Sequence, residues 1–481
     1  MSEHIPPKVL AIGLDSADPN LLLEWAANGR LPNVARLMKD GTFGRLATPD
    51  GLGDEGVWAS FATSLPPAEH GRWYHRGIRP GAYDQVRIRA GDYKHPAFWH
   101  AIDAAGKRVA VIDVPKSPQV AMAHGTAVYD WRVHGIDGPT QSHPDALAER
   151  LIERFGMDSI DRPESDHFMC NMASHSPQET RTWLQSLYQS IADKSTVSKE
   201  FLDEYWDLFL VVFKEAHCAG HLCWPPGPEI KRIYEALDQA VGELLDFAGE
   251  QTTVIIFSDL GMDYNYHGNG LLDLVLRRLE RCVISRWENA AIDVDILYHR
   301  ARNRLGMPAK SSRHRKRWAY QVEHNELSGA VRINVRGRDP SGRVSPGKQL
   351  EEFYDYLERE LLALRHPTTG RRVIDRILRT DAEQNGTARD CLPDFLVIWS
   401  REAPITTVCS TAVGTVTRTP NEDRPGNHIP GGLYVAAGPG VTSGEGSVAD
   451  IMDLGVTMAA LLDVAVAATS GRPIPSINKS T

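Results

Sequence analysis

Six short hydrophobic runs are spread along the chain, and apolar and polar positions do not alternate strictly within them. Runs of this kind, rich in Val, Ile, Leu and Phe, are typical of strands that are buried on both faces of a parallel sheet. They cover residues 9–14, 108–114, 208–213, 253–257, 394–399 and 433–437. The pattern predicts six strands of one central sheet.

Segments with apolar residues at helical spacing separate these runs. We expect helices over 20–40, from Pro177 to about 205, over 228–249 and over 451–464. The helix at Pro177 opens with Ser176-Pro-Gln-Glu179, a capping box with proline at the first helical position. Because strands and helices alternate, the sequence predicts an α/β fold: a doubly wound, mostly parallel sheet with helices on both faces.

Residues 281–390 interrupt this alternation. They contain a basic segment at 310–317 that we expect to be exposed, a strand over 330–335 and a helix over 349–364. We interpret 281–390 as a cap or insertion on a core formed by 1–280 and 391–481, rather than as an independent domain.

Composition narrows the possible functions. The 481 residues carry a formal net charge of −9, which argues against a general binder of nucleic-acid polymers. Six cysteines are too few for a disulfide framework. The longest purely apolar run, 208–213, is far too short to span a membrane, and the first residues lack the pattern of a signal peptide. We expect a cytoplasmic protein without a membrane partner, and the sequence leaves its oligomeric state open.

Metal-ligand residue types follow several of the predicted strands. Asp15 follows the first strand and Asp259 the fourth, while His217 and His221 follow the third and His428 precedes the sixth. In open α/β sheets, chemistry gathers beyond the carboxyl ends of the strands. His217 and His221 are four residues apart, so on a helical turn both imidazoles share one face. With His428 they could form a three-nitrogen site for zinc, or for iron or another divalent metal.

Several motifs, in their order along the chain, resemble the alkaline phosphatase superfamily, and within it the type I phosphodiesterase/nucleotide pyrophosphatase branch. They are VLAIGLDSADPNLLLEWAANGRLPNVARLM, VWASFATSLPPAEHGRWYHR, AGKRVAVIDVP, FSDLGM, LPDFLVIW and NHIPGGLYVAAGPG. The resemblance implies two metals that clamp the attacking and leaving oxygens of a phosphoryl transfer. One would be held by Asp15, the nucleophile, Asp259 and a histidine after it, and the other by His217, His221 and His428.

The chain departs from that family pattern at three positions. Asp54 occupies the nucleophile position, where the family has threonine or serine, and Leu260 replaces the histidine after the second aspartate. His217 stands where the family usually has aspartate. The oxygen ligands left at the first metal suit magnesium or manganese, or the site could stand empty, unless His267 reaches it. At the other site a neutral histidine would replace an anionic aspartate. Its metal would then keep more positive charge than in the family pattern.

Asp54 keeps several possible roles without a hydroxyl. It could bind a metal, act as a general base to a metal-bound water or attack as a carboxylate, and Glu55 could take over either role. Ser60 and Thr63 are nearby hydroxyls that the family places in the helix behind the nucleophile. His75 lies a few residues after His70, where the family often has a substrate-contacting polar residue.

Arginines of the predicted cap have two interpretations. Arg332 and Arg338, with Arg343 nearby, could bind a phosphate, sulfate or carboxylate of a substrate. The alternative is a charge run that is solvated or paired within the protein.

We therefore expect a metal-dependent hydrolase that acts on a small phosphate ester or phosphodiester through metal-activated water. One or two divalent metals are expected, with zinc favoured and manganese, magnesium or iron as alternatives. A single-metal, three-histidine enzyme for another ester or amide and a non-catalytic binding protein of the same fold remain open. The predicted site comprises catalytic Asp54 and Glu55, metal ligands Asp15, Asp54, His217, His221, Asp259 and His428, and substrate-binding His75, Arg332 and Arg338.

Overall fold

The computed structural model describes residues 5–89, 92–133, 140–156, 176–307, 312–324, 327–380, 386–418 and 424–478. Its central sheet has the strand order β19-β2-β18-β9-β1-β8-β5-β6-β7, with β20 beside β2. β9, β1, β8, β5 and β6 run parallel to one another, whereas β18 is antiparallel to β9 and β7 to β6. The prediction of a mostly parallel sheet is confirmed. The strands are β1 (Val9–Leu14), β2 (Thr42–Ala47), β5 (Val109–Ile112), β6 (Thr126–Tyr129), β7 (Gln141–His143), β8 (Leu208–Phe213), β9 (Thr253–Ser258), β18 (Gly432–Ala437), β19 (Gly444–Glu445) and β20 (Ala449–Asp450).

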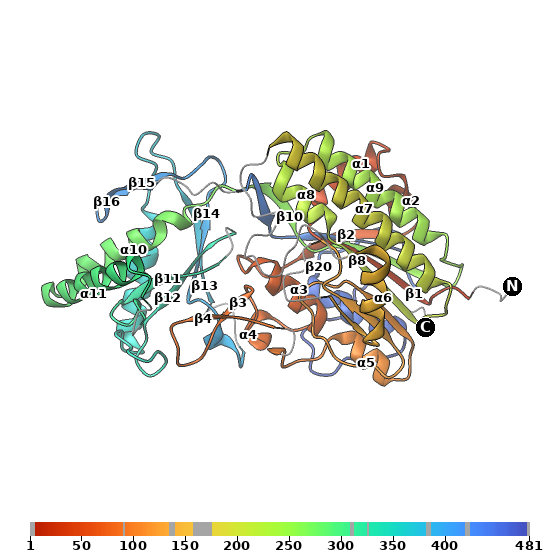
Figure 1. The fold of residues 1–481 in the computed structure, drawn as a ribbon, viewed down its shortest axis with the longest axis horizontal. Coiled ribbons are helices and arrows are strands. Elements are labelled where there is room, and N and C mark those ends of the chain that lie inside the picture. Colours follow the sequence, from red (N-terminus) through yellow and green to blue (C-terminus); the bar gives the residue numbers. More distant parts are fainter. Residues whose placement is uncertain are drawn as a thin grey trace.

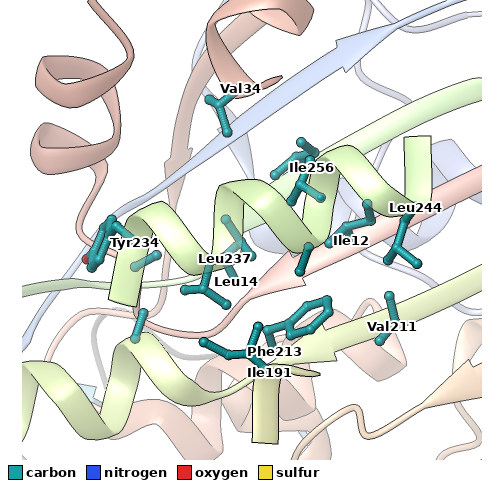
Figure 2. Packing of buried hydrophobic residues seen from close by; sticks show 14 of the residues in the cluster. Ile12, Leu14, Val34, Ile191, Val211, Phe213, Tyr234, Leu237, Leu244 and Ile256 are labelled. Atoms are coloured by element: carbon teal, nitrogen blue, oxygen red, sulfur yellow. The ribbon is translucent and has the colours of Figure 1, made fainter. Parts of the chain in front are cut away.

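Helices cover both faces of this sheet. Successive residues of a strand point to opposite faces, so the apolar strands present side chains to be buried on each face. Ile12 and Leu14 of β1 lie in one apolar cluster with α9, whereas Val9 and Ala11 lie in another with α3. Figure 2 shows the first cluster, in which Leu237 of α9 packs over the strands. The helices are α1 (Pro19–Ala27), α2 (Pro32–Asp40), α7 (Pro177–Leu202) and α9 (Pro228–Leu245) on the first face, and α3 (Gly53–Thr63), α5 (Phe98–Ala104) and α14 (Ile451–Leu461) on the second.

The single helix expected over 20–40 is wrong. The chain forms α1 and α2 instead, and the break falls between Ala27 and Pro32. Gly29 takes a positive φ of 70° there, and Pro32 opens α2 at its first position. A left-handed glycine followed by a proline ends one helix and starts another, even though the apolar spacing continues. The capping box predicted at Ser176 is confirmed, with Ser176 and Glu179 capping each other.

A second, four-stranded antiparallel sheet has the order β11-β12-β14-β13, and we use the name cap for this sheet and its helices. It lies at the opposite end of the molecule from α2 and α7 (Figure 1). β14 covers the run 394–399, so the prediction that this run belongs to the central sheet is wrong. Apolar side chains cover both faces of β14, and such a run does not reveal which sheet it joins. The cap consists of α10 (Asn269–Val283), α11 (Arg286–Arg304), β11 (Ala319–Val322), β12 (Gly329–Ile333), α12 (Lys348–Leu362), β13 (Ile374–Arg379) and β14 (Phe395–Trp399).

The cap was expected to cover 281–390. Its elements begin earlier, with α10, and end later, with β14. The basic segment at 310–317 was expected to be exposed, and this is wrong for most of its described residues, since only Arg313 of 312–317 is exposed. Arg317 is buried, and its guanidinium binds Glu280 at 2.6 Å and Asp273 at 3.2 Å. Residues 310 and 311 lie outside the described part of the chain.

Short elements connect the two sheets. Gly51, just before α3, accepts hydrogen bonds from His324 Nε2 and Ser328 Oγ of the cap, both at 2.8 Å. The cap therefore contacts the segment that leads into Asp54.

Among the described helices, none has the length and apolar character needed to cross a membrane. The remaining elements are α4 (Pro67–His70), β3 (Arg76–Ile78), β4 (Gln85–Arg87), α6 (Ala146–Phe155), α8 (Glu215–Cys223), β10 (Gly261–Tyr264), a 3-10 helix (Arg389–Cys391), β15 (Thr407–Ser410), β16 (Gly414–Thr417) and β17 (Gly426–Ile429).

Candidate metal centre

Four neighbouring strands deliver polar side chains to one edge of the central sheet. β9, β1, β8 and β5 are adjacent and parallel, so their carboxyl ends lie side by side. Asp259 follows β9, Asp15 follows β1, and α8 with His217 follows β8. Lys116 lies in the loop after β5. The predicted strand-end cluster is therefore assembled, with a lysine in addition.

Three histidines from two distant segments meet at this edge. His217 and His221 lie on α8, and His428 lies on β17, which pairs with β10. The ring centroids are 4.6–4.7 Å apart in all three pairs, and one nitrogen from each ring lies within 4.8 Å of the others. All three side chains are buried. The spatial prediction drawn from the spacing of His217 and His221 thus agrees with the geometry.

Polar contacts of Nδ1 orient two of these rings. Nδ1 of His221 lies 2.8 Å from the carbonyl oxygen of Gly426, and Nδ1 of His217 lies 3.2 Å from Oδ2 of Asp15. A ring that donates its Nδ1–H in this way keeps the Nε2 lone pair for a metal, as second-sphere partners do in metalloproteins. Nε2 of His221 is 3.2 Å from Nε2 of His428. Two nitrogens on a tetrahedral zinc, bonded at about 2.0–2.1 Å, lie about 3.3 Å apart.

The electrostatic state of the cluster suits a cation. Burial, followed by the neighbouring His217, lowers the pKa of His428 well below its usual value, so this ring is neutral. His428 Nδ1 is buried without a hydrogen-bond partner in the described part of the chain, whereas its Nε2 faces His221 Nε2. Three imidazoles with converging nitrogens fit zinc, or another divalent metal that accepts nitrogen ligands.

Two carboxylates flank the histidines. Burial alone would raise the pKa of Asp15, but the His217 imidazole beside it lowers the pKa overall. Asp15 Oδ1 also accepts a hydrogen bond from Trp58 Nε1 at 3.1 Å. Asp259 accepts the backbone N–H of Ser16 at 2.7 Å, and burial together with the charge of Asp15 raises its pKa well above the usual value.

Asp54 and Glu55 form the first turn of α3, where the helix dipole favours negative charge. The Lys116 ammonium contacts Asp54 and lies 3.6 Å from Oε1 of Glu55. Burial opposes ionisation of Asp54, but Lys116 and the nearby histidines hold its pKa well below the usual range. Burial and the charge of Asp54 raise the pKa of Glu55 to about 8. At neutral pH the two adjacent carboxyls therefore differ, with Asp54 ionised and Glu55 protonated.

Lys116 and Ser16 were not among the residues predicted from the sequence. The rule that selected Asp15 and Asp259 looked for metal-ligand residue types past buried strands, so it passed over Lys116 after β5. Ser16 follows Asp15 directly, and its hydroxyl lies 3.0 Å from Asp15 Oδ1 and 3.3 Å from His217 Nδ1. A search of the first two residues after each strand would have included Ser16.

Buried ion pairs fix the segments that hold the site. Asp113, at the end of β5, contacts the ammonium groups of Lys194 and Lys214, each at 2.9 Å. Lys194 also lies 3.4 Å from Glu215, the first residue of α8. One charged network thus ties the loop of Lys116 to the helix of His217.

Other predicted residues lie elsewhere. Leu260 packs in an apolar cluster and offers no ligand, and His267 accepts the Asn269 N–H at the start of α10. The Ser60 hydroxyl bonds to His70 Nε2 at 3.0 Å, so both belong to the packing behind α3. His75 is half-buried within electrostatic reach of Lys116 and Asp54.

Arg332 and Arg338 are paired inside the cap, which is the second of the two interpretations. Arg338 binds Asp394 and Asp339, at 2.5 Å and 3.0 Å. Arg332 is buried and binds Asp339 at 3.2 Å as well as two backbone carbonyls. Apart from Arg332 Nε, which is buried without a partner in the described part of the chain, their guanidinium nitrogens are engaged within the protein, so we leave both out of the proposed site.

A family model described as type I phosphodiesterase/nucleotide pyrophosphatase matches residues 9–407. No curated protein sequence matches the chain. Among solved structures, phosphonoacetate hydrolase from Sinorhizobium meliloti 1021 bound to phosphonoacetate is 14% identical with a TM-score of 0.52, and 90% of each chain is covered. An inactive threonine-to-alanine variant of murine ectonucleotide pyrophosphatase/phosphodiesterase 5 bound to AMP is 12% identical with a TM-score of 0.52 over 97% of each chain. At these identities the likeness is one of fold.

Proposed function

The chain belongs to the type I phosphodiesterase/nucleotide pyrophosphatase family, and from that premise we propose that it is a metal-dependent hydrolase of a small phosphate ester or phosphodiester. The observation that carries the proposal is the convergence of His217, His221 and His428. Three buried imidazoles with converging nitrogens match a zinc ligand set.

His217, His221 and His428 would hold the metal through three nitrogens. Bound there, a divalent cation would lower the pKa of a coordinated water and stabilise negative charge on the reacting phosphoryl group. Asp15 keeps the His217 ring in place through its contact with Nδ1, and the Gly426 carbonyl does the same for His221.

Asp54 and Glu55 would handle the protons of the reaction. Asp54, ionised beside Lys116, can accept a proton from the attacking water. Glu55, with a pKa of about 8, can donate a proton to the leaving oxygen near neutral pH. Adjacent groups with pKa values pushed apart are a common basis for paired acid and base roles. His75 would contact the substrate.

A second candidate is a single-metal enzyme that cleaves a different ester or an amide. The observation that favours it is the absence of a hydroxyl at position 54, where the family carries its nucleophile. The two candidates share the three-histidine metal and differ in the bond that is cleaved.

The test combines metal analysis with a substrate panel. The purified protein, loaded with zinc or manganese, would be assayed with aryl phosphate, aryl phosphodiester, aryl sulfate and aryl carboxylate esters. We expect bound metal and preferential turnover of a phosphate ester or diester. His428→Ala should lose the metal and the activity, whereas His124→Ala, an exposed histidine, should keep both. A protein without bound metal, or unchanged turnover in His428→Ala, would refute the proposal, and preferential carboxylate ester cleavage would favour the second candidate.

A further inference from the structure

The second metal site implied by the family resemblance lacks part of its ligand set. That site would need Asp15, Asp54 and Asp259 together with a nitrogen ligand at position 260. Position 260 is a leucine whose side chain is buried in the same apolar cluster as Trp58 and Phe257. Among the described residues, the three histidines are the one group that brings three candidate ligand atoms within 4.8 Å of one another.

A lysine already binds the carboxylate at the centre of that set. The Lys116 ammonium contacts Asp54 Oδ2, while Asp54 Oδ1 accepts the backbone N–H of Glu55 at 3.1 Å. The same ammonium lies 3.6 Å from Glu55 Oε1. Lys116 is buried, so its charge is shielded from water and acts on the groups around it. A metal bound to Asp54 would have to displace this ion pair.

The two aspartates beside it also have internal partners. Asp15 contacts His217 Nδ1 through Oδ2, and its Oδ1 accepts hydrogen bonds from Trp58 and Ser16. Asp259 Oδ1 accepts the Ser16 N–H. Asp259 Oδ2 is buried without a hydrogen-bond partner in the described part of the chain. Lys116 supplies, beside Asp54, the local positive charge that a second cation would otherwise provide.

The backbone holds Lys116 firmly in this place. Lys116 has a φ of 49° and Asp113 a φ of 60°, both in the left-handed region that non-glycine residues rarely occupy. Two buried lysines hold the Asp113 side chain, and the Tyr93 hydroxyl donates to the Lys116 carbonyl. Such conformations persist where the surroundings over-determine them.

We propose that this centre binds a single divalent metal, at His217, His221 and His428, and that the Lys116 ammonium takes the place of the second cation beside the reacting phosphoryl group. The inference rests on the proposed function for the first metal. A lysine ammonium offers three donors and a fixed positive charge, which suits a phosphoryl oxygen. In this arrangement Lys116 both keeps Asp54 ionised and stabilises negative charge on the substrate.

The first test is metal stoichiometry, measured by plasma mass spectrometry after loading with zinc or manganese and dialysis. We expect one metal per wild-type chain. The double variant Lys116→Met/Leu260→His removes the ammonium and restores the missing nitrogen, and it should bind two. Lys199→Met, which breaks an ion pair at the outside of α7, should stay at one.

The outcomes separate this inference from the proposed function. Two metals in the wild-type chain would overturn the lysine assignment and leave the hydrolase proposal intact, whereas no metal at all would overturn the hydrolase proposal. A folded double variant that still binds one metal would also contradict the lysine assignment. The wild-type measurement decides the question even if the double variant fails to fold.

A second test probes the anion directly. Inorganic phosphate should bind the metal-loaded wild-type protein, and Lys116→Met should weaken this binding by more than tenfold while the three-histidine metal remains. Lys199→Met should bind phosphate like the wild type. Unchanged phosphate affinity in a folded, metal-loaded Lys116→Met protein would overturn the proposed contact.

Discussion

Two groups of buried charged residues, one at the strand ends of the central sheet and one in the cap, were both candidates for function from the sequence. At the strand ends, side chains from β1, β5, α8, β9 and β17 converge, and the histidine nitrogens face one another. In the cap, Arg332 and Arg338 direct their guanidinium groups at Asp339 and Asp394 of the same sheet region.

The difference lies in whether the protein itself satisfies the polar groups. The cap arginines pair with carboxylates and carbonyls of the fold, and Arg332 Nε is their one buried nitrogen without a partner in the described part of the chain. The three histidines instead bring one ring nitrogen each within 4.8 Å of the others, and His428 Nδ1 has no hydrogen-bond partner in the described part of the chain. Buried charges that are paired within the fold indicate structure, whereas ring nitrogens that converge in the manner of metal ligands indicate a ligand.

The largest expected effect is on catalysis at Asp54. Asp54→Asn keeps the shape of the side chain but removes its charge and its ability to accept a proton. We expect turnover of the best phosphate substrate to fall by about 10²–10⁴-fold, the range of general acid–base contributions. Metal content should stay at that of the wild type, because the three histidines hold the metal. Steady-state kinetics and metal analysis on the same sample would check this, and loss of the metal would show that Asp54 is a ligand instead.

The cap ion pairs should affect stability rather than activity. Arg338→Met leaves Asp394 buried without its strongest partner, and we expect a loss of about 3 kcal/mol in the free energy of unfolding. Turnover per folded molecule should stay within a factor of about three, since each guanidinium nitrogen of Arg338 already donates within the protein. Urea unfolding and kinetics would measure both quantities.

Arg336→Met supplies the matched control, because Arg336 is an exposed arginine two residues away on the same loop. It should change stability little. If Arg338→Met raised KM strongly at unchanged stability, the arginine would be a substrate contact and the contrast between the two clusters would fail.

His70 allows a pH test on a histidine that the protein does satisfy. Burial, with Arg72 and His95 nearby, lowers the pKa of His70 to about 3 from the ordinary 6.5. The stability associated with the neutral ring is therefore complete above pH 6.5 and is lost as the pH falls from 6.5 toward 3. At pH 5 the loss should be about 2 kcal/mol, at about 1.4 kcal/mol per pH unit.

His70→Asn can still accept the Arg72 N–H but does not titrate in this range. Urea unfolding at pH 6.5 and pH 5 should therefore show a smaller pH dependence in the variant than in the wild type. Equal pH dependence in the two proteins would mean that His70 does not remain neutral in the folded state.

The smallest effect is expected at His75. Burial, followed by Lys116 and Arg87, lowers its pKa to about 4, so the ring is neutral at pH 7 and can contact a substrate only as a hydrogen-bond partner. A single such bond between neutral groups is worth about 1 kcal/mol. His75→Gln should lower kcat/KM by about fivefold without changing metal content, and an unchanged kcat/KM would remove His75 from the site.

The sequence predicted elements well where one local signal decides the structure. β1 and β8 have the expected bounds, and the α7 cap follows from Ser176 and Glu179. Which sheet β14 joins depends on packing with distant segments, so the apolar run alone could not decide it. Lys116 escaped prediction because lysine is not a metal ligand type, and its role depends on an ion pair across 62 residues of sequence.

The most direct test of the account is a crystal structure of the zinc-loaded protein with data collected on both sides of the zinc absorption edge. The account predicts one anomalous peak, bonded at about 2.0–2.1 Å to a ring nitrogen of each of His217, His221 and His428. It also predicts the Lys116 ammonium, without a metal, beside Asp54. The absence of a peak at the three histidines, with those sites open and the protein folded, would contradict it.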